Sequence, residues 1–227
     1  MDVRAVGRAR VDKWWWAVPV VGLALLAGCS SSPAAAPNTV MVVGDSVALL
    51  EQSVLTPMLA PPHHVVYVAR YHSGIAPFAT VTTSRMSSSG IPRAMIVNIG
   101  TDEASRPRPR PTTVPTLQPF MDAVSGVSCV VLTTVSLGAD ERSRTSVALI
   151  LNNEIKRLAI ADPKRIKVVD WENFLVTLPA AKLSTYLRPD RIHPTAAGAQ
   201  WLATSDVSGI QACGKVAQPT AIGAIGR

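Results

Sequence analysis

The sequence of 227 residues is poor in aromatic side chains, at 5%, and in charged ones, at 16%. Coiled coils need many charged residues at their exposed positions, so this composition excludes a coiled-coil protein. Three cysteines are too few for a small domain held together by disulfides. In contrast, 48% of hydrophobic residues is too much for a disordered chain. We therefore expect a globular domain with a sizeable core.

Several signatures of cofactor chemistry are also missing from the sequence. It contains no P-loop, no dinucleotide fingerprint, no G-x-S-x-G nucleophile turn and no group of Cys, His or carboxylate residues with metal-ligand spacing. We therefore predict neither a metal ion nor another cofactor. The formal net charge of +7 is spread along the chain without interleaved aromatic residues, so nucleic acid is not an expected partner.

The first 28 residues differ in character from the rest of the chain. Most of the charged residues in 1–13 are basic, and residues 14–28 (WWWAVPVVGLALLAG) carry no charge. A basic segment followed by a short apolar run is typical of an export signal. The apolar run is shorter than the roughly 20 residues that span a bilayer, and Pro19 interrupts it. The run leads into Leu26-Ala27-Gly28-Cys29, which resembles the lipobox of bacterial lipoproteins.

The lipobox resemblance implies that residues 1–28 are a removed signal peptide and that the Cys29 thiol carries a diacylglycerol. Residues 29–37 then form a flexible tether to a protein anchored outside the cytoplasm, in the bacterial cell envelope, by its lipid. An N-terminal helix that stays attached is the alternative for this segment. The main domain is expected over residues 38–213, followed by a loose tail over 214–227.

Short runs rich in β-branched residues alternate with helical patterns along the main domain. Strands are predicted at 39–43, 65–69, 94–99, 129–135 and 166–170. Helices are predicted at 47–59, 147–158 and from near Pro194 through Leu202. Pro61-Pro62 must end the first helix. The alternation predicts an α/β domain, a three-layer α/β/α sandwich with a mainly parallel, flavodoxin-like sheet of five strands.

Two stretches are biased in composition, and neither is predicted as a helix or strand. Residues 82–90 are rich in serine, and residues 106–111 read RPRPRP, for which we predict a solvated loop.

In a sheet of this kind, functional residues follow the carboxyl ends of the strands. Gly44-Asp45-Ser46 follows the first predicted strand and opens a helix, where backbone N–H groups favour a negative oxygen. A serine nucleophile there needs a base, and the base needs an acid to orient it. Asp190 and His193, three positions apart near the last helix, fit these two roles. Alternatively, Ser46 only caps the helix, and Asp190 and His193 form a loop pair.

The blocks VVGDSVALL (42–50) and PDRIHPTAAGAQ (189–200) make residues 38–212 resemble the SGNH (GDSL-type) hydrolase family. In addition, VVDW at 168–171 and Asn152 resemble the SGNH domains linked to membrane acyltransferases that modify surface glycans. The resemblance implies a serine ester hydrolase whose catalytic triad is Ser46, His193 and Asp190. It implies acyl-ester substrates, with acetyl groups on envelope glycans as the leading candidate, and either hydrolysis or transfer of the acyl group.

The same resemblance implies an oxyanion hole built from the Ser46 amide, a glycine amide and an asparagine side chain. Gly74 matches the glycine, and a turn residue of positive φ is its alternative role. Asp102 stands where the family has asparagine. An ionised carboxylate cannot donate a hydrogen bond, and losing one oxyanion donor costs about a hundred- to a thousandfold in rate. Asp102 is then protonated and donates, or points away while backbone amides suffice, or belongs to a weakly catalytic site.

The departure at Asp102 keeps a second class of function open. In that alternative the chain is a non-catalytic lipoprotein that binds an envelope glycan or another envelope component in the same place. We expect solvated loop positions for His63, His64 and His72, with contact to the substrate as the alternative for His72.

Two cysteines remain besides Cys29. Cys129 and Cys213 are expected to form a disulfide in an oxidising envelope, with two buried thiols as the alternative. We expect a monomer.

Overall fold

The computed structural model describes residues 36–105, 116–136 and 147–214. The predicted signal peptide, Cys29, most of the predicted tether, the RPRPRP stretch and nearly all of the tail lie outside these ranges. None of the helices within the ranges combines the length and the hydrophobicity that crossing a membrane requires.

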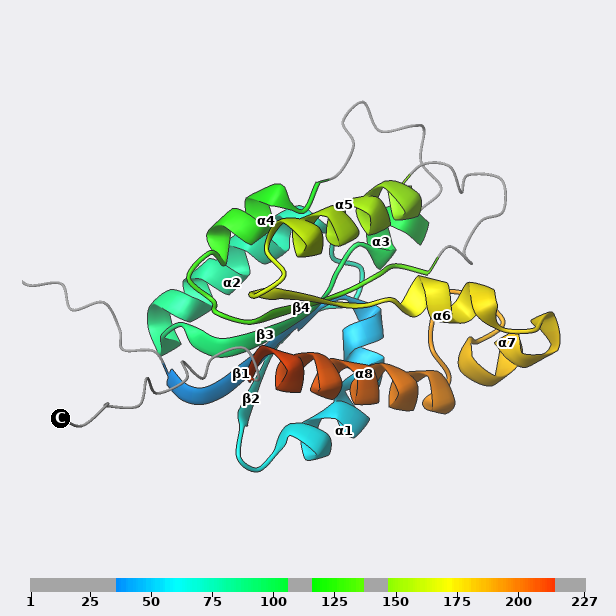
Figure 1. The fold of residues 1–227 in the computed structure, drawn as a ribbon, viewed down its shortest axis with the longest axis horizontal. Coiled ribbons are helices and arrows are strands. Elements are labelled where there is room, and N and C mark those ends of the chain that lie inside the picture. Colours follow the sequence, from blue (N-terminus) through cyan, green and yellow to red (C-terminus); the bar gives the residue numbers. More distant parts are fainter. Residues whose placement is uncertain (1–35, 106–115, 137–146, 215–227) are drawn as a thin grey trace, which may run out of the picture. The chain divides into compact units, whose positions relative to one another are not determined.

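Five parallel strands form the central sheet (Figure 1). They are β1 (Ala36–Gly44), β2 (His64–Ala69), β3 (Pro92–Asn98), β4 (Val130–Thr133) and β5 (Ile166–Val169). Their order in the sheet is β2-β1-β3-β4-β5, and every neighbouring pair is parallel. This is the flavodoxin-like order of a doubly wound sheet. The predicted fold class is therefore confirmed, and each predicted strand overlaps an observed one.

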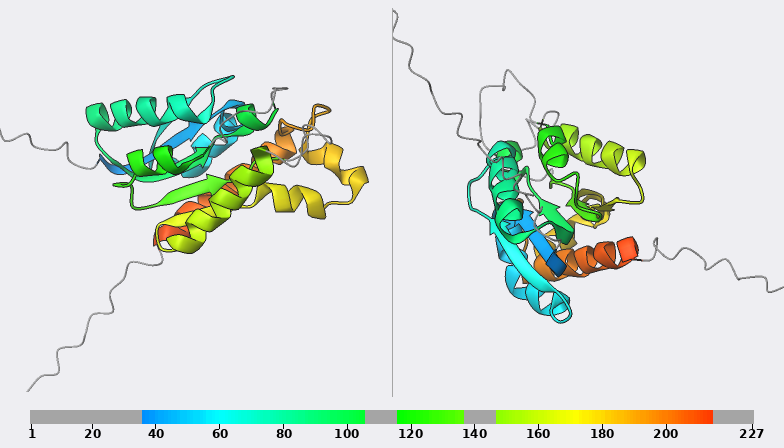
Figure 2. Two further views of the ribbon diagram at one scale, coloured as in Figure 1. Left: turned by 90° about the horizontal axis from the view of Figure 1, so that it is seen from above. Right: turned by 90° about the vertical axis from the view of Figure 1, so that its left-hand side faces the viewer.

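Helices cover both faces of the sheet (Figures 1 and 2). One layer holds α2 (Ile75–Ser89), α3 (Thr101–Ser105), α4 (Gln118–Ala123) and α5 (Val147–Ala161). The other layer holds α1 (Ser46–Leu59), α6 (Trp171–Thr177), α7 (Ala180–Tyr186) and α8 (Ala196–Gly214).

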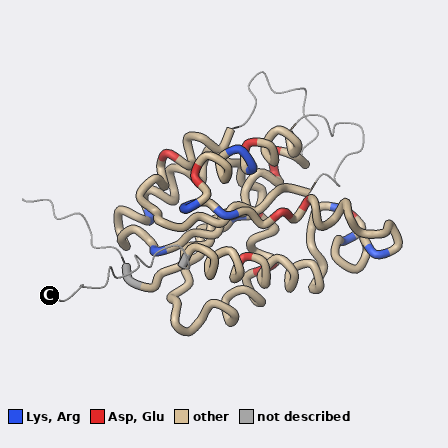
Figure 3. Tube along the Cα trace, viewed as in Figure 1, with Lys and Arg blue, Asp and Glu red and all other residues tan. Residues whose placement is uncertain are grey.

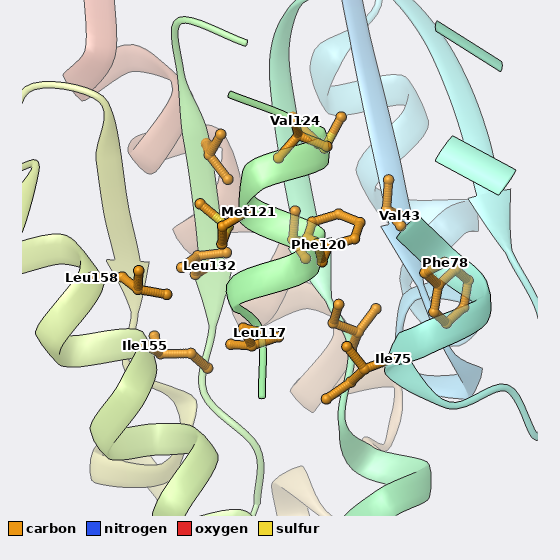
Figure 4. Packing of buried hydrophobic residues seen from close by; sticks show 14 of the residues in the cluster. Val43, Ile75, Phe78, Leu117, Phe120, Met121, Val124, Leu132, Ile155 and Leu158 are labelled. Carbon is orange, nitrogen blue, oxygen red and sulfur yellow. The ribbon is translucent and has the colours of Figure 1, made fainter. Parts of the chain in front are cut away.

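Each face of the sheet has its own hydrophobic core, because successive side chains of a strand point to opposite faces. In β1, Met41 and Val43 belong to the core under α2, α4 and α5, whereas Val40 and Val42 belong to the core under α1 and α8. Figure 4 shows the first of these cores, with Phe120 of α4 packed among residues of the sheet and the neighbouring helices.

Helix α2 occupies a region for which we predicted no helix, and its second half is the Ser-rich stretch. Serine is a weak helix former because its hydroxyl competes for backbone groups. Here the hydroxyls bond within the helix instead, as where Ser87 Oγ donates to the Thr83 carbonyl at 2.9 Å. The buried residues of α2 recur at helical spacing: Ile75, Phe78, Thr82 and Met86. That spacing is the signal that would have predicted the helix.

The predicted helices are present with small shifts at their ends. Helix α1 ends at Leu59, just before Pro61-Pro62, and Pro57 lies inside it. Helix α8 begins two residues after Pro194 and extends to Gly214.

A disulfide between Cys129 and Cys213 joins α8 to the sheet. Cys129 directly precedes β4, and Cys213 lies in the last turn of α8, with 5.8 Å between their Cα atoms. The bond links positions 84 residues apart, and a crosslink that closes a long loop restricts the unfolded chain strongly. The predicted pairing is therefore present in the structure.

Charged residues are sparse on the described domain, and Lys and Arg are distributed over several elements rather than gathered in one stripe (Figure 3). Two acidic residues are buried together where α1 packs against α8. Glu51 is 1% exposed and Asp206 is 0% exposed. Thr133 Oγ1 of β4 donates to Asp206 Oδ1 at 3.4 Å.

Burial raises the pKa of Asp206 to about 7. Burial, together with the neighbouring Asp206, also raises the pKa of Glu51 well above its usual value. Because two adjacent carboxyl groups resist ionising together, the pair retains at least one proton at neutral pH.

We expect the free energy of unfolding to fall as the pH rises from about 4 to about 7. Over this range the unfolded chain releases protons that the buried pair still holds, so rising pH favours the unfolded state. Asp206→Asn removes one such proton and should flatten the dependence by up to about 1.4 kcal/mol per pH unit. Denaturant unfolding at a series of pH values measures this, with Asp122→Asn on the exposed side of α4 as the control. An unchanged slope in Asp206→Asn would contradict the prediction.

Candidate active site

The turn from β1 into α1 depends on Gly44. A Cβ at this position would overlap the Ala48 side chain and lie 2.8 Å from the Asn98 carbonyl oxygen. Only glycine lets the helix start this close to strand β3. The turn therefore presents Ser46, the first residue of α1, at the carboxyl end of the sheet.

Asp45, rather than Ser46, is the N-cap of α1, so the helix-cap alternative for Ser46 is wrong. Asp45 Oδ1 accepts the Val47 N–H at 3.1 Å, and Oδ2 accepts the N–H of Thr101, the first residue of α3, at 3.0 Å. Burial raises the pKa of Asp45 to about 6, although both hydrogen bonds act in the opposite direction. The capping role of Asp45 leaves the Ser46 hydroxyl available for another contact.

The loop before α8 brings His193 to Ser46. Ser46 Oγ and His193 Nε2 are 2.8 Å apart, although 147 positions separate the two residues in the sequence. The other ring nitrogen, Nδ1, lies 2.8 Å from Asp190 Oδ2. A hydroxyl, an imidazole and a carboxylate are thus connected in the order that nucleophilic catalysis requires.

Backbone N–H groups of the same loop hold Asp190. Its Oδ1 accepts the N–H of Ile192 at 2.9 Å and that of His193 at 3.0 Å. Burial would raise the pKa of Asp190, but the hydrogen bonds from His193 and Ile192 outweigh it and keep the pKa below its ordinary value. The carboxylate is therefore ionised at neutral pH and can stabilise a positive charge on His193.

The loop that carries Asp190 and His193 is fixed from both sides. An antiparallel bridge joins Leu187 to Pro194, and the Arg188 N–H donates to the His193 carbonyl at 2.8 Å. From the segment that follows β4, Ser136 Oγ donates to the Arg191 carbonyl at 3.3 Å. These bonds hold the imidazole in place relative to the strand ends.

Gly74 directly precedes α2, in the turn that follows β2. Its φ is −77°, so its alternative role as a positive-φ turn residue is wrong. The Glu103 carboxylate lies directly against Gly74, and a Cβ at this position would overlap it unless the Glu103 side chain moved. Glu103 Oε1 accepts the Ile75 N–H at 2.6 Å. Sequence reasoning assigned no role to Glu103, since no local pattern connects positions 28 apart.

Asp102 is the second residue of α3, which follows β3, and is 8% exposed. Gly100, with a φ of 109°, turns the chain from β3 into α3, a conformation that favours glycine. The bond from the Thr101 N–H to Asp45 holds this turn beside the one that carries Ser46. The proposed roles of Gly74 and Asp102 toward an oxyanion stay predictions.

Asn152 of α5 holds the segment that follows β4. Its buried carboxamide accepts the Val135 N–H at 2.7 Å and donates to the Val135 carbonyl at 2.8 Å, as a neighbouring strand would. This contact fixes the chain just before Ser136, whose hydroxyl bonds to the loop of His193.

Of the other histidines, His63 is half-buried in the loop before β2, and His72 is exposed in the loop after β2, as expected. His64 is the first residue of β2 rather than part of a loop. Within residues 36–105, 116–136 and 147–214, no three Cys, His, Asp or Glu residues are grouped so that they could hold a metal ion.

The described domain has the fold of the SGNH (GDSL-type) hydrolases, which confirms the predicted resemblance at the level of the fold. The C-terminal catalytic domain of peptidoglycan O-acetyltransferase A from Streptococcus pneumoniae aligns with a TM-score of 0.61 at 15% identity, over 78% of this chain and 95% of that one. No protein-family model and no curated protein matches the sequence.

Two other solved structures are similar to a comparable degree. A lipase/acylhydrolase from Enterococcus faecalis aligns with a TM-score of 0.58 at 18% identity, over 77% of this chain and 95% of that one. A catalytic mutant of an acetylxylan esterase from Geobacillus stearothermophilus gives 0.56 at 17% identity, over 79% and 96%.

Proposed function

We propose that the chain is a serine hydrolase of SGNH type that acts on acyl esters, with Ser46 as the nucleophile. The observation that carries the proposal is the 2.8 Å contact between Ser46 Oγ and His193 Nε2, with Asp190 on the other ring nitrogen. The alternative, in which Asp190 and His193 only pair within their loop, does not explain why the imidazole contacts Ser46, which lies 147 positions away in the sequence.

In this mechanism, Ser46 Oγ attacks the ester carbonyl while its proton moves to His193 Nε2. Asp190 stabilises the resulting imidazolium through Nδ1. His193 then returns the proton to the leaving alcohol oxygen, and the acyl group stays on Ser46 as an ester. A second nucleophile gives its proton to His193 Nε2 and attacks the acyl carbon. The bond from that carbon to Ser46 Oγ then breaks, and His193 returns the proton to Ser46 Oγ. Water gives hydrolysis, and a sugar hydroxyl gives acyl transfer.

The oxyanion of the tetrahedral intermediate would form at the N-terminus of α1, where the Ser46 amide and the helix dipole favour negative charge. The Gly74 amide serves as the second donor in this proposal. Asp102 occupies the third position, where only its protonated form can donate a hydrogen bond. An ionised Asp102 would weaken the stabilisation of the oxyanion.

Acetyl groups on cell-envelope glycans are the substrate class that we favour. By their names, two of the similar structures are a peptidoglycan O-acetyltransferase and an acetylxylan esterase, so both act on acetylated polysaccharides or form them. The proposed lipid on Cys29 would hold the domain at the envelope, close to such polymers.

A second candidate function is binding of an envelope glycan without turnover. The aspartate at position 102 favours this candidate, because the family's asparagine donates to the oxyanion and an ionised aspartate does not.

Ser46→Ala should lower the rate of p-nitrophenyl acetate hydrolysis by about a thousandfold or more, because the nucleophile is lost. Release of p-nitrophenol by the purified chain of 227 residues measures the rate. Ser53→Ala, an exposed serine on the same helix, is the control and should retain the wild-type rate. Equal background rates for the wild-type protein and Ser46→Ala would exclude hydrolysis of short acyl esters at this site.

Asp102→Asn should raise kcat for the same ester by about tenfold or more, because the amide adds a donor that an ionised carboxylate lacks. The ratio of variant to wild-type kcat for p-nitrophenyl acetate, measured at one pH, tests this. A loss of activity in Asp102→Asn would show that the carboxylate itself takes part.

We also propose that Cys29 is the lipidated N-terminus of the mature chain. Mass spectrometry of protein from bacterial membranes should show a chain that begins at Cys29 and carries a diacylglycerol. Cys29→Ser should abolish the adduct, whereas Cys213→Ser should leave it in place. A chain that still begins at Met1 and carries no lipid would refute the anchor.

A further inference from the structure

Two acidic side chains connect the turns that follow β1, β3 and β2. Asp45, in the turn after β1, accepts the N–H of Thr101, the first residue of α3, at 3.0 Å. Glu103, also in α3, accepts the N–H of Ile75, the first residue of α2, at 2.6 Å. Side chain to backbone bonds therefore join the three turns in a row, outside the hydrogen bonds of the sheet.

The Glu103 carboxylate also lies directly against Gly74. A Cβ at position 74 would overlap Oε1 and lie 3.8 Å from Oε2. Ile75 is the first residue of α2, so its N–H has no partner within the helix, and Gly74 has no side chain with which to cap it. Glu103 performs the capping from a different segment of the chain. The position of the turn around Gly74 thus depends on Glu103.

The electrostatics agree with a close arrangement of the turns. Burial is the main cause of the raised pKa of Asp45, and the negative charge of Glu103 raises it further. Glu103 is therefore near enough to the turn of Ser46 to affect a carboxyl group that adjoins it.

We propose that Glu103 is a positioning residue for the reaction, because it holds the Gly74 amide at the place where the oxyanion forms. This inference rests on the proposed function, in which the Gly74 amide is an oxyanion donor. Such a donor must lie within hydrogen-bond distance of the oxygen as it is in the transition state. A displaced Gly74 therefore lowers kcat and leaves KM nearly unchanged, since the loss is confined to the transition state.

Glu154 provides a matched control, because it makes the same kind of contact in another part of the domain. Its Oε1 accepts the Thr116 hydroxyl at 2.6 Å, and its Oε2 accepts the N–H of Leu117, the N-cap of α4, at 3.0 Å. Removing Glu103 or Glu154 removes a bond at the start of a helix, but only Glu103 adjoins Gly74. The comparison separates positioning for catalysis from a contribution to stability.

The experiment measures kcat and KM for p-nitrophenyl acetate, together with Tm, in four variants of the chain of 227 residues. Glu103→Ala should lower kcat by about a hundredfold, since small displacements of catalytic groups have effects of this size. Glu103→Gln should recover most of the loss, because its amide oxygen can still accept the Ile75 N–H. Glu103→Asp keeps the charge but is one methylene shorter, so it should resemble Glu103→Ala. Glu154→Ala should lower Tm and leave kcat at the wild-type value.

Three results would overturn the inference, and they separate it from the proposed function. Wild-type kcat in Glu103→Ala and Glu103→Asp, with Ser46→Ala inactive, would remove the positioning role and leave the proposed function intact. An equal loss of kcat in Glu103→Gln and Glu103→Ala would show that the charge matters rather than the accepted hydrogen bond. If Ser46→Ala is as active as the wild-type protein, the proposed function fails, and the inference fails with it. Should Glu103→Ala not fold, Glu103→Asp and Glu103→Gln decide the question.

Discussion

The pairing of β1 with its two neighbours is the constraint on which the site depends. Gly44 is level with Ala69 of β2 on one side and with Asn98 of β3 on the other. Because all three strands are parallel, the turns that follow them leave the sheet at one edge. The absent side chain of Gly44 then allows α1 to start against Asn98. This register therefore places Ser46 beside the turn that follows β3.

The second half of the site depends on α8, which is held at several points along its length. The bridge between Leu187 and Pro194 fixes the chain before the helix, and the buried pair of Glu51 and Asp206 lies where α8 packs on α1. The disulfide of Cys213 ties its last turn to the sheet. A helix fixed in this way holds the preceding loop, and with it the imidazole, at a constant distance from Ser46.

Few charged residues are present, and several of the acidic ones are used inside the domain. An ionised carboxylate is costly to bury unless donors surround it. Asp45 meets that requirement with two backbone N–H groups, and Glu103 accepts one from Ile75. Glu51 and Asp206 meet it differently, by retaining a proton. The carboxylates of Asp45 and Glu103 thus bond to backbone N–H groups at the starts of helices, whereas Glu51 and Asp206 lie buried between α1 and α8 with a retained proton.

The sequence by itself determined the strands, most of the long helices and the short motifs, because these depend on residues only a few positions apart. The two motifs, one after the first predicted strand and one before the last predicted helix, also led to the hypothesis that Ser46 contacts His193. Helix α2 was missed because its serines obscured a regular apolar spacing. The tertiary structure alone decided the contact between Ser46 and His193, the bond from Thr101 to Asp45 and the packing of Glu103 on Gly74. The residues in each of these contacts lie far apart in the chain. The turns after β1, β2 and β3 meet because parallel strands end at one edge of the sheet, and His193 meets Ser46 because the loop before α8 is held there.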